Sequence, residues 1–163
     1  MSTEHKSNTP SDIKDCWQTP RALFKTLDNE FEFECDVAAS VDNTLCKLWF
    51  DEEDSALNNE WYKVNYLNPP YSNIGPWVDK AIIEHQKGKT IVMLVPSDTS
   101  VQWYKRARET CHEVRFISGR ISFVNAETQK AEGGNNKGSV ILVWRANAPK
   151  YFVEMLLDRD DLL

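Results

Sequence analysis

Thr90-Ile91-Val92-Met93-Leu94-Val95 is a continuous run of β-branched and other apolar residues. A run with no alternating polar positions is typical of a strand that is buried on both faces of a parallel sheet. A helical pattern precedes it at 75–86, and another follows it at 101–110. Because strand and helix alternate around the run, the sequence predicts an open α/β sheet.

The same patterns predict the elements on either side of this core. A helix is expected at 21–29, after Thr19-Pro20, and the segment 40–59 is expected to be loop with a short helix. Strands are expected at 31–38, 62–67, 113–117, 121–124 and 139–144. We therefore predict an α/β fold with a compact, mostly parallel open sheet and an antiparallel edge hairpin.

Length and composition indicate one globular unit: the chain has 163 residues, of which 41% are hydrophobic. We expect a single domain over residues 16–163 and a polar, disordered lead-in over 1–15. No apolar run approaches the roughly 18 residues of a membrane span, and the start of the chain has no signal-peptide pattern. The cysteines lack metal-ligand spacing and are expected to be reduced thiols. These features predict a cytoplasmic protein without a metal site or a membrane partner. They leave the oligomeric state open, and a monomer is the expectation.

The formal net charge of −6 argues against a general attraction to nucleic acid. The charges are unevenly distributed, however, because Lys and Arg concentrate in the segment 105–137. One basic side on an acidic protein is compatible with a local DNA-facing patch. A solvated helix face is an equally good explanation for the basic residues at 105–108.

Leu67-Asn68-Pro69-Pro70-Tyr71 follows directly on the predicted strand 62–67. The two prolines fix φ at about −65° and supply no N–H, so the chain beyond Asn68 is stiff. The Asn68 carboxamide and the Pro69 carbonyl then offer oxygen acceptors to an amino group with two hydrogens. Tyr71 adds a flat ring on which a planar molecule can stack. The motif predicts a pocket for a planar amine, and a proline-rich turn without such a function is the alternative.

Acidic residues stand where the ligand of an open α/β sheet would bind. Asp36 and Ala38 lie at the end of the predicted strand 31–38, where a carboxylate followed by small residues permits close approach of a ligand. A carboxylate that caps a turn is the alternative. Asp54 follows at nearly the spacing with which an acid reaches ribose hydroxyls in dinucleotide-binding folds. Its acidic neighbours 51–53 compete for that role.

Three further residues could touch a ligand. Trp17 and Thr19 precede the first predicted helix, and Thr19 either caps this helix or contacts a ligand. Arg120 follows Gly119 between two predicted strands, where a guanidinium can hold a phosphate with two hydrogen bonds. A surface arginine on an edge strand is the alternative.

The chain resembles the phage Dam-like DNA N-6-adenine-methyltransferase family over about residues 16–144. The resemblance rests on landmarks in the family's order and at similar spacing, at 16–20, 33–40, 51–57, 67–72, 77–81, 94–96 and 115–123. It implies a Rossmann-like methyltransferase fold, S-adenosylmethionine as methyl donor and adenine in double-stranded DNA as acceptor. For a phage or prophage protein, it also implies the cytoplasm of the host bacterium.

The family's motifs also imply roles for single residues. Catalysis maps onto Asn68, Pro69, Pro70 and Tyr71. Cofactor binding maps onto Thr19 and Asp36, with further candidate cofactor contacts at Trp17, Ala38, Asp54 and Asn68. Too few residues separate Asp36 from Asn68 for the two extra strand–helix units of larger methyltransferases, so some cofactor contacts must come from 51–54 or elsewhere.

We expect no separate target-recognition domain in residues 16–163, so loops would have to read the DNA sequence. The Gly-rich loop 125–138, with Asn135, Asn136 and Lys137, is the candidate, together with Arg120. Asn can bond adenine with two hydrogen bonds in the major groove. A disordered connector is the alternative reading of this loop. The rival functions are an amino methyltransferase acting on RNA or on a protein glutamine, and a non-catalytic DNA-binding relative.

Overall fold

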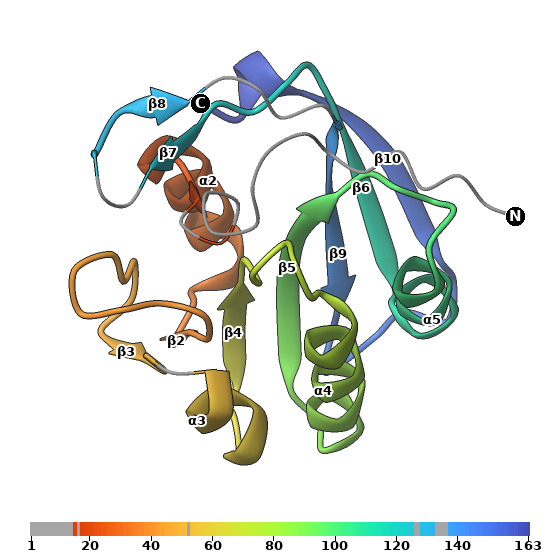
Figure 1. Cartoon of the computed structure of the whole chain (residues 1–163). Helices are drawn as coiled ribbons and strands as arrows, with labels where there is room; N and C mark the ends of the chain where they lie inside the picture. Colours follow the sequence, from red (N-terminus) through yellow and green to blue (C-terminus); the bar gives the residue numbers. More distant parts are fainter. Residues whose placement is uncertain (1–14, 16, 52, 126–127, 133–136) are drawn as a thin grey trace, which may run out of the picture.

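The computed structural model describes residue 15 and residues 17–51, 53–125, 128–132 and 137–163. Its main sheet has seven strands in the order β10-β6-β9-β5-β4-β2-β3 (Figure 1). These strands are β2 (Cys35–Asp36), β3 (Leu48–Trp49), β4 (Val64–Leu67), β5 (Thr90–Pro96), β6 (Glu113–Ser118), β9 (Ser139–Trp144) and β10 (Val153–Asp158). A second sheet has the order β1-β7-β8, from β1 (Trp17–Gln18), β7 (Phe123–Asn125) and β8 (Ala131–Glu132).

The helices are α2 (Arg21–Phe31), α3 (Glu53–Asn58), α4 (Gly75–Gln86) and α5 (Gln102–Thr110), with a short 3-10 helix at Arg159–Asp161. Figure 1 shows α4 and α5 side by side on one face of the main sheet. Within the described ranges, no helix combines the length and the apolar composition needed to cross a membrane.

Strand directions confirm the prediction of a mixed α/β fold with a mostly parallel sheet. Neighbouring strands of the main sheet pair in parallel, except that β9 is antiparallel to both β5 and β6. The antiparallel strand lies toward one end of the sheet, with β6 and β10 outside it. The sequence analysis did not predict β10, whose side chains alternate between half-buried and exposed.

The central strand β5 is buried on both faces, as its sequence predicts. Ile91, Met93 and Val95 pack in the cluster that contains α3, α4 and α5 side chains. Val92 and Leu94 pack on the opposite face with the apolar side of α2. The main sheet is therefore the middle layer between helices, and its strand ends are the places where polar residues can be accessible.

The first predicted strand was wrong in its start, because helix α2 continues to Phe31. Glu32 then takes a left-handed conformation with φ 55°, which ends the helix. Phe31 and Phe33 stack on each other, and Phe33 also contacts the ring of Tyr66. Only Cys35–Asp36 remains as strand. The alternation of apolar and charged residues at the start of 31–38 therefore comes from aromatic rings that pack next to α2, and not from a strand.

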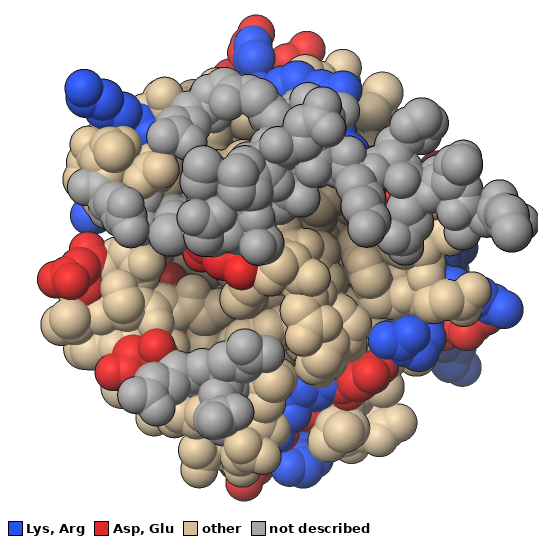
Figure 2. All heavy atoms as spheres, in the orientation of Figure 1, with Lys and Arg blue, Asp and Glu red and all other residues tan. Residues whose placement is uncertain are grey.

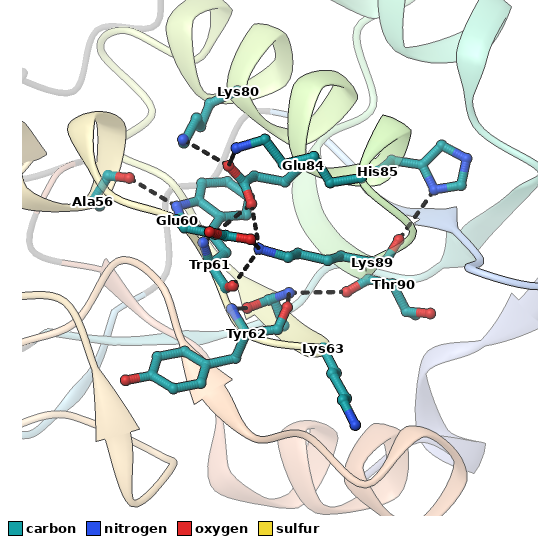
Figure 3. Close-up of polar contacts among 12 residues, drawn as sticks. Ala56, Glu60, Trp61, Tyr62, Lys63, Lys80, Glu84, His85, Lys89 and Thr90 are labelled. Atoms are coloured by element: carbon teal, nitrogen blue, oxygen red, sulfur yellow. Dashed lines mark hydrogen bonds and ion pairs between the residues drawn. The ribbon is translucent and has the colours of Figure 1, made fainter.

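A buried carboxylate holds the amino-terminal edge of the main sheet together (Figure 3). Glu84 of α4 has a side chain that is 0% exposed, and it forms ion pairs with Lys80 at 2.7 Å, Lys87 at 3.2 Å and Lys89 at 2.8 Å. Its Oε2 atom also accepts a hydrogen bond from the Trp61 backbone N–H at 3.1 Å. These contacts tie α4 to the segments that enter β4 and β5.

Candidate active site

The motif after β4 lies beside the end of β2, at the carboxyl edge of the main sheet. Asp36 is in register with Tyr66, and Asn68 follows two residues later. With the usual strand spacing and rise, the Cα atoms of Asp36 and Asn68 are about 8 Å apart. The predicted site residues Trp17, Thr19, Ala38 and those at 68–71 also belong to segments at this edge.

The carboxamide of Asn68 has one bonded end and one unbonded end. Its Nδ2 atom donates a hydrogen bond to the backbone carbonyl of Trp17 at 3.0 Å. Its Oδ1 atom is buried and has no hydrogen-bond partner among the described residues. A buried acceptor without a partner is costly and is rare in folded proteins. Asn68 therefore presents an oxygen that is ready to accept a hydrogen from a ligand.

Three aromatic rings pack against one another next to the Asn-Pro-Pro-Tyr motif. Trp17 stacks on Phe123 with ring centroids 5.5 Å apart and an interplanar angle of 7°. Tyr71 meets both rings edge-on, at 6.0 Å from Trp17 and 5.8 Å from Phe123. Burial raises the pKa of the Tyr71 hydroxyl far above its usual range, so this group stays protonated. Tyr71 can contribute a ring surface here, and it cannot act as a general base near neutral pH.

Thr19 contacts strand β4 and does not cap helix α2. The residue at the N-cap of α2 is Pro20, and no side chain caps this end. The Thr19 hydroxyl is instead hydrogen-bonded to the hydroxyl of Tyr66 in β4, and both residues are buried. The capping alternative for Thr19 is therefore wrong.

Asp36 is a buried carboxylate at the end of β2, with 4% of its surface exposed. Its Oδ2 atom accepts a hydrogen bond from the Leu45 backbone N–H at 3.1 Å. Burial raises its pKa from 3.8 to about 6, against the opposing effect of backbone N–H bonds from Leu45 and Ala38. The group is thus ionised at neutral pH at a cost in desolvation, and a ligand that donates hydrogen bonds to it would offset this cost.

The remaining predicted site residues do not all lie in the described part of the chain, and those that do lie at different places in the fold. Asp54 lies in α3, and its side chain is outside the described part of the chain. Asn135 and Asn136 lie outside the described residues. Lys137 pairs with Asp98, beyond the end of β5, at 2.5 Å. Arg120 is exposed and follows Gly119, whose φ of 93° turns the chain between β6 and β7.

Where the structure describes it, the basic segment 105–137 does not form one continuous basic surface. Arg115 is buried and pairs with Glu30 and Glu113. Lys105 and Arg106 pair with acidic residues on α5 and α4. On the face drawn in Figure 2, Lys and Arg atoms alternate with Asp and Glu atoms. The solvated-face explanation therefore holds for the basic residues of α5, and Arg115 belongs to the interior.

Sequence reasoning missed several polar and aromatic contacts of this edge. The Asp15 carboxylate accepts hydrogen bonds from the Ser72 backbone N–H at 3.1 Å and from the Ser72 hydroxyl at 2.6 Å. The sequence pattern predicts Phe123 only as part of the strand 121–124. No local pattern marks these contacts, because each joins segments that are far apart in the chain.

Comparisons with known proteins identify the family to which this chain is similar. A family model described as DNA N-6-adenine-methyltransferase (Dam) matches residues 6–163. The DNA N-6-adenine-methyltransferase of Escherichia phage T1 is 36% identical over 157 residues, which cover 85% of this chain and 66% of the phage T1 protein. The protein of the same name from Haemophilus phage HP1 (strain HP1c1) is 34% identical over 149 residues, which cover 88% of this chain and 86% of that protein. The chain thus spans just under two thirds of the phage T1 protein.

Proposed function

We propose that this chain, which belongs to the DNA N-6-adenine-methyltransferase (Dam) family, transfers a methyl group from S-adenosylmethionine to N6 of adenine in double-stranded DNA. The observation that carries the proposal is the Asn68 carboxamide, with its buried and unpartnered Oδ1 atom at the carboxyl edge of the sheet. An exocyclic amine of adenine supplies the hydrogens that this acceptor lacks. Mostly parallel strands with a site at this edge also support a Rossmann-like methyltransferase fold.

The residues of the chain act by positioning. An adenine inside a duplex has to rotate out of the helix, which costs roughly a few kcal/mol of pairing and stacking. Asn68 Oδ1 and the Pro69 carbonyl then accept the two N6 hydrogens and aim the nitrogen lone pair, while Tyr71 offers its ring to the base. Because Tyr71 stays protonated, the N6 proton leaves to solvent after transfer has made the nitrogen more acidic.

S-adenosylmethionine would supply an electrophilic methyl group at this edge. Asp36 fits such a ligand because it is a buried carboxylate that is ionised at neutral pH and bonded to backbone N–H groups. Thr19 and Ala38 lie on the same edge and are the further proposed contacts, with Trp17 and Asn68 beside them. Asp54 is proposed as the acid for the ribose hydroxyls.

Transfer of a labelled methyl group tests this function directly. The protein is incubated with methyl-labelled S-adenosylmethionine and with duplex DNA, RNA or bacterial protein, and the labelled product is identified. We expect N6-methyladenine in DNA. Label in RNA or in a protein glutamine would replace the proposal with one of its enzyme rivals, and cofactor-independent DNA binding without transfer would indicate a non-catalytic relative.

Cofactor affinity is expected to rise as the pH increases through about 6 and to level off above this value. Only the ionised Asp36 carboxylate can accept hydrogen bonds with both oxygens, and burial moves its pKa from 3.8 to about 6. Because the folded protein holds this proton more tightly than the unfolded chain, the free energy of unfolding of the cofactor-free protein should fall as the pH rises from 3.8 to about 6. Titration calorimetry with S-adenosylmethionine at several pH values measures the affinity.

Asp36→Asn is the matched variant, because it keeps the shape of the side chain and does not titrate. This variant should bind the cofactor weakly at every pH, and its cofactor affinity should no longer rise as the pH increases through about 6. Asp36→Ala should weaken cofactor binding much more than DNA binding. A variant that loses DNA affinity alone would show that the cofactor binds elsewhere.

DNA contacts are proposed for Arg120 and Lys137 and for Asn135 and Asn136. The logarithm of the DNA binding constant should fall linearly with the logarithm of salt concentration, by about 0.9 per phosphate contact. Arg120→Ala should reduce this slope by about one contact, since the exposed guanidinium can reach a phosphate. Lys63→Ala, at the opposite edge of the sheet, should not change it. Equal slopes for Arg120→Ala and wild type would place the DNA face elsewhere.

A further inference from the structure

Residues 15 and 17–19, which we call the N-terminal strap, contact the candidate site at three points. The Asp15 carboxylate accepts both hydrogen bonds of Ser72, just beyond the Asn-Pro-Pro-Tyr motif. The Trp17 carbonyl accepts the Asn68 amide hydrogen. The Thr19 hydroxyl bonds to the Tyr66 hydroxyl, two residues before Asn68. The strap is therefore anchored on both sides of Asn68, and its middle holds Asn68 itself.

The Trp17 carbonyl decides which way the Asn68 amide points. A carbonyl oxygen can only accept a hydrogen bond, so the atom facing it must be Nδ2 and the opposite atom must be Oδ1. Rotation of the amide by half a turn would place N–H against the substrate amine, and two donors would then face each other. The contact with the strap thus selects the orientation that can bind an amino group.

The strap is also supported from its far side. Trp17 and Gln18 form β1, which pairs with Asn125 and Val124 of β7. The Trp17 ring stacks on Phe123 of the same strand. The strap therefore lies between β7 and the Asn-Pro-Pro-Tyr turn, and this limits how far the Trp17 carbonyl can move.

We propose that the N-terminal strap orients the Asn68 carboxamide for methyl transfer and that Asp15 and Ser72, which anchor it beside the motif, are positioning residues. The proposal rests on the proposed function for its kinetic consequence. Its structural part concerns the Asn68 amide alone, and this part can be measured without any substrate.

The first measurement uses nuclear magnetic resonance on the free protein. Asp15→Ala removes the acceptor of both Ser72 hydrogen bonds, and Asp15 and Ser72 are exposed, so the variant should keep its fold and its melting temperature. Hydrogen exchange of the Asn68 side-chain amide should be several-fold faster than in wild type. Unchanged exchange in Asp15→Ala would overturn the proposal.

The second measurement is steady-state methyl transfer. A misplacement of about 1 Å can cost up to about 100-fold in rate, so Asp15→Ala should lower kcat by about 10- to 100-fold with the KM for DNA within a few-fold. Asp15→Asn keeps one side-chain oxygen and should recover part of the rate. An unchanged kcat in Asp15→Ala, with an active wild type, would also overturn the proposal.

Ser72→Ala has a close control in Ser100→Ala. Ser100 donates the same pair of bonds to Asp98, at 3.1 Å from its backbone N–H and 2.6 Å from its hydroxyl, on the same edge of the sheet. Ser72→Ala should lower kcat and Ser100→Ala should not; equal effects would contradict a role specific to the strap. If the wild-type protein showed no methyl transfer, the proposed function would be wrong. Hydrogen exchange of the Asn68 side-chain amide would still show whether the strap holds Asn68.

Discussion

Asn68→Ala is expected to lower kcat for methyl transfer at least about 100-fold and to keep cofactor affinity within a few-fold of wild type. The substitution removes the buried, unpartnered Oδ1 acceptor and the hydrogen bond to the Trp17 carbonyl. It leaves the Tyr71 ring and the Asp36 carboxylate in place. Transfer of labelled methyl to duplex DNA measures kcat, and calorimetry measures cofactor binding.

Asn73→Ala is the control for this variant. Asn73 is exposed and lies just beyond the motif, so loss of its side chain should not change the rate. Near-normal turnover by Asn68→Ala would refute the role given to this amide. Loss of cofactor binding together with turnover would mean that Asn68 serves chiefly the cofactor.

Glu84→Gln is expected to reduce the free energy of unfolding by about 3 kcal/mol, because removal of one charge from a buried ion pair leaves its partners uncompensated. Glu84 is the shared partner of Lys80, Lys87 and Lys89, and its side chain is 0% exposed. Urea unfolding followed by fluorescence measures the change at neutral pH.

Glu60→Gln is a matched control, since Glu60 and Glu84 both lie 2.8 Å from the Lys89 ammonium, but the Glu60 side chain is 68% exposed. Its loss should change stability far less than the loss of Glu84. The ion pairs also lower the pKa of Glu84 from 4.5 to about 2. Its contribution should be complete above pH 4.5 and should disappear as the pH falls toward 2. Equal losses in the two variants would contradict this account.

Elements with a strong local pattern were predictable from the sequence. The continuous apolar run of β5, the strand β9 and the helix α4 lie where periodicity places them. The two-residue strands β1, β3 and β8 were not predictable, because such short strands exist only through pairing with distant segments. β10 was missed because its exposed positions interrupt the apolar pattern of an edge strand.

The candidate site also has a part that the sequence could predict and a part that it could not. The motif at 68–71 is contiguous, so the sequence alone was enough to predict a pocket for a planar amine there. The hydrogen bond of Thr19 depends on Tyr66, which lies far away in the chain. The contact of Asp15 with Ser72 likewise joins residues that no local rule connects. The sequence placed Arg115 in the basic segment 105–137. Counting charges along the chain could not show that this side chain is buried and pairs with Glu30 and Glu113.

The antiparallel strand β9 lies between β5 and β6, although both precede it in the chain. During synthesis, β5 and β6 therefore emerge from the ribosome before the strand that joins them, and each has an unpaired apolar edge until then. Non-local pairing of this kind slows folding, and exposed strand edges favour aggregation. The chain should consequently gain its cooperative stability only after residues 139–144 have emerged, and fragments that end before Ser139 should aggregate rather than fold.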